Sequence, residues 1–310
     1  MNVESVGSSL LWGGFLAFVL AMLALDLGVF HRKSHAVSTR EAAIWSAVWV
    51  ALALLFAFGV QLAHGPERAL EFVTGYVIEK ALSVDNIFVF VVIFGYFRVP
   101  AALQHRVLFW GILGALVLRA AFVLAGGAFL ARFHWAIYVF GAILVLTGIK
   151  LLLERGASPD PAANPIVRLA RRVLPVSEDF DGERFFTRLG GRRAATPLFL
   201  ALLVVEATDV VFAVDSIPAI FAITRDPFLV FTSNIFAILG LRSLYFLLAG
   251  VIERFRYLKP ALALVLLFVG AKMLLAEVWK VPVGLSLGVI AAILGGAVLL
   301  SLARPPRPRT

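Results

Sequence analysis

Carboxylates stand inside the most apolar stretches of this chain, where a charge is costly. EATDVVFAVDSIPAIFAIT contains Glu206, Asp209 and Asp215, and GYVIEKALSVDNIFVF contains Glu79 and Asp85. The sixth such acid, Asp26, lies in ALDLGVF. An ionised acid at the centre of a membrane-spanning helix costs about 2.5–3.5 kcal/mol on insertion scales. These side chains should therefore face the protein interior and have partners there.

The available donor atoms favour hard divalent cations. Carboxylates and carbonyls suit Mg²⁺, Ca²⁺ and Mn²⁺, whereas soft metals prefer thiolate, thioether or imidazole. The chain has no Cys, three Met, and five His that fall in loops or at helix ends. This disfavours Cu(I) outright and weakens the case for Zn²⁺. We predict that one divalent ion is coordinated by Asp85, Glu206, Asp209 and Asp215, with Glu79 and Asp26 as nearby ligands or proton carriers.

The alternative interpretation is structural. The six acids could form buried ion pairs that fix helix packing, with five intramembrane bases: Lys80, Arg119, Lys150, Arg242 and Lys272. Five of the six acids, however, gather on two helices, whereas the bases are spread over five. Under the metal hypothesis, Arg119 and Arg242 neutralise the carboxylates once the ion has left. Protonation of buried acids would then compete with metal, which would allow proton-coupled antiport.

A straight helix cannot point all three acids of the later motif at one ion. Glu206 and Asp209 share a helix face, but Asp215 lies about 180° around the axis from Glu206. Pro218 withdraws a backbone donor and clashes with the preceding turn. We therefore predict a helix break around Asp215 and Ser216, with unwound carbonyls beside the carboxylate. The alternative is a kink at Pro218 that only aids helix packing. The earlier motif has Asp85 and Asn86 at the same place but no proline.

The two acidic motifs belong to an internal repeat. EKALSVDNI aligns with DVVFAVDSI, and the match continues through two pairs of bases, Arg119 with Arg242 and Lys150 with Lys272. Asn234, which matches Gly111, could be a neutral ligand or a hydrogen-bonding group between helices. Each copy covers three predicted helices, so the second copy enters the membrane from the opposite side. Such inverted repeats are typical of secondary transporters, whose sites lie between the repeats near the midplane.

Hydropathy predicts an all-α polytopic membrane protein. Hydrophobic residues form 61% of the 310, and a spanning helix needs about 20 apolar residues. Nine runs meet that need, at roughly 8–30, 42–62, 70–97, 106–129, 134–153, 196–224, 228–250, 260–276 and 281–303. The predicted organisation is two N-terminal helices (1–69), the first repeat (70–153), a cytoplasmic loop (154–195), the second repeat (196–276), and a last helix with a basic tail (277–310).

The basic residues indicate orientation rather than a nucleic-acid partner. With the N-terminus outside, 19 Lys and Arg fall on the inner side and four on the outer side, which fits the positive-inside rule. The N-terminus is thus predicted outside and the C-terminus in the cytoplasm. No Walker, GxSxG or other enzyme motif is present, and no prosthetic group is indicated. The expected partners are the bilayer, a divalent ion and protons, with the oligomeric state left open.

The acidic motifs, together with ALDLGVFHRK and TSNIFAILGLRSLYFLLAG, resemble the TerC family from end to end, and closely its Alx-like branch. The resemblance implies a Mn²⁺ efflux protein of the bacterial inner membrane. It also implies that the family's acidic positions are Asp26, Glu79, Asp85, Glu206, Asp209 and Asp215. A different possibility is a membrane scaffold of the tellurite-resistance type, whose loop recruits partners and whose buried charges only hold the bundle.

Overall fold

The computed structural model describes residues 5–25, 38–133, 135–153, 165–249, 257–275, 278 and 281–303. Asp26 lies outside these ranges, and so does the side chain of Asp85, although its backbone is helical. The longer helices are α1 (Ser9–Leu25), α2 (Thr39–His64), α3 (Pro66–Tyr96), α4 (Ala101–Arg132), α5 (Ala136–Leu153), α7 (Pro197–Phe221), α8 (Pro227–Leu239), α10 (Leu258–Leu274) and α11 (Val283–Ala303). Two shorter helices are α6 (Pro165–Val173) and α9 (Leu241–Leu248).

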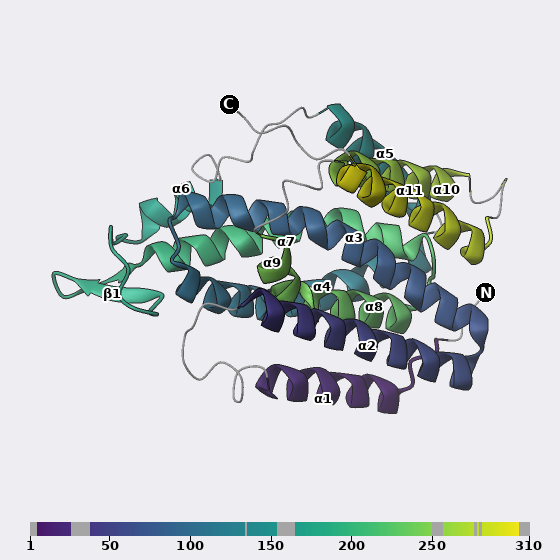
Figure 1. Cartoon of the computed structure of the whole chain (residues 1–310), viewed down its shortest axis with the longest axis horizontal. Coiled ribbons are helices and arrows are strands. Elements are labelled where there is room, and N and C mark those ends of the chain that lie inside the picture. The colour runs from purple at the N-terminus through teal and green to yellow at the C-terminus, as the bar shows by residue number, and fades with distance from the viewer. Residues whose placement is uncertain are drawn as a thin grey trace.

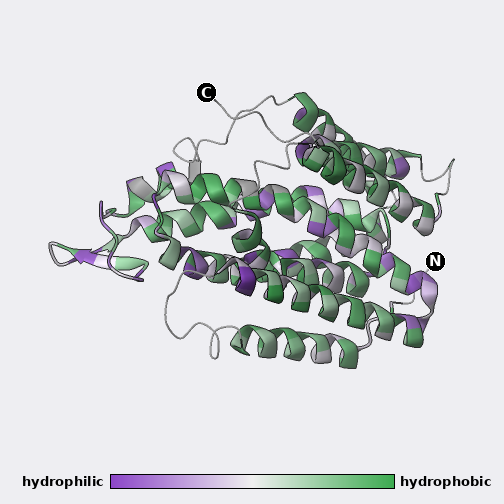
Figure 2. Ribbon diagram, in the orientation of Figure 1, coloured by the Kyte–Doolittle hydropathy of each residue, from purple (hydrophilic) through white to green (hydrophobic). Residues whose placement is uncertain are grey.

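The helices carry apolar side chains on their outer surfaces, as a protein in contact with lipid must. Leu54, Leu55 and Leu62 of α2 and Leu146 of α5 are largely exposed, and apolar residues dominate the helical bundle in Figure 2. Five helices of the described chain are long and apolar enough to cross a bilayer, or six if α8 and α9 form one broken span. The protein is therefore a mainly helical, polytopic membrane protein.

The helices form layers around a central pair (Figure 1). α3 packs against α7, and each of them also packs against the second helix of the other predicted repeat, α3 on α8 and α7 on α4. On one side of this centre α5 packs along α10, which in turn contacts α11; on the other side lie α2 and α1. Phe side chains fill the space between α1, α2, α3 and α8, with Phe56 contacting Phe72 and Phe236.

The predicted break in the later acidic helix is wrong. α7 is helical without interruption from Pro197 to Phe221, with Pro218 inside it. A proline removes one backbone hydrogen bond, but Pro218 stands within one turn of the helix end, so little helix depends on that bond. The acids of α7 consequently keep the angular spacing of a regular helix, and Asp215 points away from Glu206.

A break does occur in the next helix of the same predicted repeat. α8 ends at Leu239, Gly240 follows, and α9 continues from Leu241 after a bend of 40°. Gly240 is packed closely, since a Cβ there would lie 2.6 Å from Lys80 Nζ and 3.2 Å from Trp49 Cβ. The absence of a side chain at Gly240 thus allows α2 and α3 to approach the bend.

The segment between the predicted repeats is folded in its described part, residues 165–195. It contains α6 and a hairpin of β1 (Phe186–Leu189) and β2 (Arg192–Ala195), which pair with Phe186 opposite Ala195. Gly190 and Gly191 take positive φ at the hairpin turn, where glycine is favoured. Arg106 of α4 binds Glu183 at 2.8 Å and lies over the ring of Phe185. These contacts attach the segment to the bundle; the hairpin was not predicted.

Candidate functional site

One arginine lies at the centre of the bundle between the two acidic helices. Arg119 of α4 pairs with Glu79 of α3, and its Nε and Nη2 donate to the two oxygens of Asp209 of α7 at 3.2 and 2.9 Å. The side chains of Arg119 and Glu79 are each 1% exposed, and that of Asp209 is 6% exposed. The three groups form a desolvated ion triad with one positive and two negative members.

Two neutral side chains form further hydrogen bonds with this triad. Asn234 of α8 donates from Nδ2 to Glu79 Oε2 at 3.0 Å, and Arg119 Nη1 donates to Ser216 Oγ at 3.3 Å. Asn234 was predicted to be either a neutral metal ligand or a hydrogen-bonding group between helices, and in this structure it makes a hydrogen bond between α8 and α3. Ser216, predicted to lie at a helix break beside the metal site, accepts a hydrogen bond from Arg119. The Glu79 carboxylate therefore has a partner on each oxygen, which is what a buried charge requires.

The other two acids of α7 contact groups outside the triad. The Glu206 carboxylate occupies the space left by Gly114 of α4, where any side chain would collide with it. Asp215 accepts from Thr147 Oγ1 of α5 at 2.9 Å. Glu206 and Asp209 thus share the face of α7 directed at α4, as predicted, while Asp215 is directed at α5. An unbroken α7 explains this divergence.

The predicted ligands do not converge on one point within the described residues. No three carboxylate or imidazole side chains there lie close enough together to hold a metal ion. Asn86 is buried, and its Oδ1 finds no hydrogen-bond partner in that part of the chain. Arg242 is buried in α9, just after the bend. Because Asp26 and the Asp85 side chain lie outside the described residues, the full six-acid site stays a prediction.

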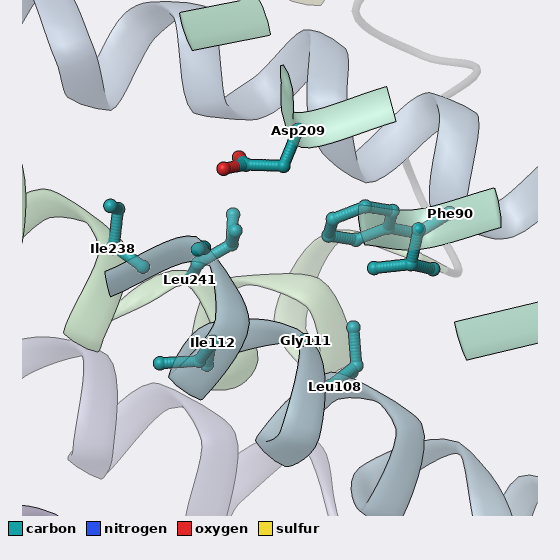
Figure 3. A pocket seen from close by; sticks show the side chains of 9 residues that line it. Phe90, Leu108, Gly111, Ile112, Asp209, Ile238 and Leu241 are labelled. Atoms are coloured by element: carbon teal, nitrogen blue, oxygen red, sulfur yellow. The ribbon is translucent and has the colours of Figure 1, made fainter. Parts of the chain in front are cut away.

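A small cavity opens beside Asp209 (Figure 3). Its volume is about 10 Å³, near the minimum for a single water molecule. Apart from the Asp209 carboxylate, its walls are apolar and come from Phe90, Leu108, Ile112, Ile238 and Leu241, with Gly111 at one side. The cavity gives Asp209 open space that the fully enclosed Glu79 does not have.

Sequence reasoning missed several partners of the buried bases and acids. Lys80 was considered only as an ion-pair partner, yet its Nζ donates to the carbonyl oxygen of Ala237 at the end of α8, at 3.2 Å. Lys272 donates to Ser286 of α11 at 3.0 Å. Thr147 and Gly114 were not singled out, because neither is ionisable. Small and hydroxyl residues in spanning helices often mark helix contacts, and this property could have drawn attention to both positions.

Comparison with known proteins places the sequence of this chain in a family. Residues 64–309 match the family described as integral membrane protein TerC. The chain belongs to the TerC family. Among its TerC relatives is an uncharacterized membrane protein of Myxococcus xanthus, which is 62% identical over 298 residues, or 96% of this chain and 93% of that one. No solved structure matches the chain.

Other relatives of this TerC protein are named Alx. The Escherichia coli K12 protein called "Putative membrane-bound redox modulator Alx" is 50% identical over 301 residues, covering 94% of each chain. The protein of the same name from Photorhabdus laumondii is 47% identical over 309 residues, covering 97% of each. The resemblance to the TerC family and its Alx-like branch is thereby confirmed.

Proposed function

We propose that this TerC-family protein exports a divalent metal ion, Mn²⁺ above all, across the bacterial inner membrane. The observation that carries the proposal is the buried triad: two acids at matching positions of the two repeats share Arg119. A guanidinium that neutralises both carboxylates occupies a position suited to an oxygen-preferring cation. Departure of the arginine would free hard oxygen ligands in a dry environment.

The packing supports the inverted repeat. If the repeats are α3–α4–α5 and α7–α8/α9–α10, a two-fold axis exchanges the α3–α8 contact with the α4–α7 contact, and both occur. The alignment of Lys150 with Lys272 also pairs Gly141 with Ala263 and Gly148 with Gly270. A Cβ on Gly141 would lie 3.1 Å from the Gly270 carbonyl oxygen, and one on Gly148 would lie 2.9 Å from that of Ala263. These two contacts exchange under the same axis.

The proposed orientation keeps the N-terminus outside and the C-terminus in the cytoplasm. Val6 N donates to Asp226 Oδ2 at 2.6 Å, which joins the N-terminal segment to the loop before α8. At the opposite end of the bundle lies the Arg-rich segment of residues 165–195 (Figure 1). Separating the two segments in this way puts the greater positive charge on the cytoplasmic side.

The test is efflux of radioactive manganese from cells that carry Glu206→Gln, Asp215→Asn or Asp85→Asn. Glu206 and Asp215 do not contact Arg119 in the hydrogen-bond network, so their loss should leave the triad intact. We expect each variant to insert normally and to lose most export. Asp179→Asn, on an exposed residue of the cytoplasmic segment, serves as the control and should export at the wild-type rate. Wild-type export by all three site variants would refute the carboxylate route.

A structural role as a membrane scaffold is the second candidate. It is favoured by the pairing of both Glu79 oxygens and both Asp209 oxygens with protein donors. The Alx relatives are named redox modulators. A redox role in this chain could not use thiol chemistry, because the chain has no Cys. If deletion of residues 157–190 abolishes the stress phenotype while manganese export continues, the scaffold function is supported.

A further inference from the structure

The two repeats share one triad, but only one of them supplies its arginine. Under the repeat alignment Glu79 corresponds to Asp209, and Arg119 corresponds to Arg242. A two-fold axis through the triad would therefore leave the pair of carboxylates unchanged and would replace Arg119 by Arg242. In this structure Arg119 holds both carboxylates, so the described conformation is one of two that the repeat permits.

The helices that carry the two arginines differ in one respect. α4 runs unbroken from Ala101 to Arg132 with Arg119 in its middle. In the second repeat the helix breaks at Gly240, two residues before Arg242, and bends by 40°. The position in α4 that corresponds to Gly240 is Val117, inside regular helix. The bend therefore moves Arg242 out of the position that Arg119 holds in its own repeat.

Lys80 stabilises this bend. The break leaves the Ala237 carbonyl at the C-terminal end of α8, and Lys80 Nζ donates to it at 3.2 Å. A cation at a helix C-terminus also interacts favourably with the helix dipole. Lys80 Nζ lies 2.6 Å from the place of a Cβ on Gly240, and Trp49 of α2 closes the other side. Lys80 belongs to the first repeat, so one repeat holds the bend of the other.

We propose that Arg119 and Arg242 alternate as the counter-ion of Glu79 and Asp209. In the second state α8 and α9 straighten at Gly240, Lys80 releases Ala237, and Arg242 takes the place that Arg119 leaves. The divalent cation neutralises the carboxylates between the two states. This inference rests on the proposed function, because it makes the exchange of arginines the step that turns the site from one side of the membrane to the other.

A disulfide can lock the bend, because the chain has no Cys of its own. The Cβ position of Gly240 lies 3.2 Å from Trp49 Cβ, close to the roughly 3.5–4.5 Å found between the Cβ atoms of disulfides. In the Trp49→Cys/Gly240→Cys variant we expect oxidation to abolish manganese export and reduction to restore it. Each single variant, treated with the same oxidant, is the control. Export by the fully cross-linked protein at the rate of its reduced form would overturn the proposal.

The rate of cross-linking is a second readout that needs no transport. In the same double-cysteine background, Arg119→Gln leaves the carboxylates to Arg242, so cross-linking should be slower. Arg242→Gln removes the alternative state, so cross-linking should be as fast as before or faster. Changes in the same direction for both arginine variants would overturn the alternation.

The two readouts separate the inference from the function on which it rests. If the wild-type protein moves no manganese while the arginine variants shift cross-linking in opposite directions, the export proposal fails and the exchange of arginines stands. If export occurs and cross-linking is indifferent to both arginines, the export proposal stands and the exchange fails.

Discussion

Replacement of Arg119 by Gln should destabilise the protein strongly. In the described conformation the change removes the cation that is hydrogen-bonded to both Glu79 and Asp209, whose side chains are 1% and 6% exposed. Breaking a buried ion pair by removing one partner costs about 3–5 kcal/mol. At about 2 °C per kcal/mol for a chain of this size, the midpoint of thermal unfolding should fall by roughly 6–10 °C.

The assay is thermal unfolding of the purified protein in a mild detergent, with two matched variants. Arg119→Lys keeps the charge but lacks the planar fork that reaches both carboxylates, so it should recover only part of the loss. The triple variant Glu79→Gln/Arg119→Met/Asp209→Asn removes all three charges and should recover most of it, because a neutral replacement avoids the desolvation cost. An Arg119→Gln variant that unfolds within about 1 °C of the wild type, also when Arg242 is replaced by Gln so that it cannot take the place of Arg119, would contradict the triad as a coupled unit.

Three further predictions concern a neutral hydrogen bond to the triad, a close contact between two helices, and a helix N-cap. Asn234→Leu should cost about 1–3 kcal/mol by leaving Glu79 Oε2 without its donor, measured in the same unfolding assay, and no loss would exclude that hydrogen bond. Gly148→Ala should cost about 1–3 kcal/mol because the new Cβ meets Leu267 at 2.8 Å; Gly288→Ala, in open space on α11, is its control and should be neutral or stabilising. Asp226→Ala removes an N-cap of α8 that accepts from Phe228 N and Val6 N, which should cost about 0.5–2 kcal/mol and speed amide exchange at residues 5–7. Unchanged exchange there would mean that the N-terminal segment does not depend on Asp226.

The sequence predicted the positions of the spanning helices well, because the requirement for apolar residues in lipid acts on each segment separately. Helices occur at all nine predicted runs, and within the described residues five of them, or six if α8 and α9 form one broken span, are long and apolar enough to cross a bilayer. The hairpin at residues 186–195 was not predicted, because its strands are short and carry charged residues. Its formation depends on the turn at Gly190 and Gly191 and on contacts with α4.

The helix break was predicted at the wrong residue, and the reason is physical. Pro218 is the stronger helix breaker by propensity, but near the end of α7 its missing donor has little effect. Gly240 has a modest intrinsic cost, yet neighbours fill the space around it and Lys80 binds the carbonyl freed at Ala237. Tertiary contacts, rather than local propensity, thus decide where the chain bends between α7 and α10.

The sequence by itself determined that carboxylates lie inside the membrane segments, that they recur in two matching motifs, and that bases recur with them. These are properties of residue type and spacing, which the cost of charge in lipid makes conspicuous. Only the tertiary structure decided which base meets which acid. Arg119 reaches both Glu79 and Asp209 because α4 is unbroken and packs on α7, while Arg242 follows a bend. Asp215 is turned towards Thr147 because α7 is unbroken. Distances between helices depend on packing, and no spacing along the chain specifies them.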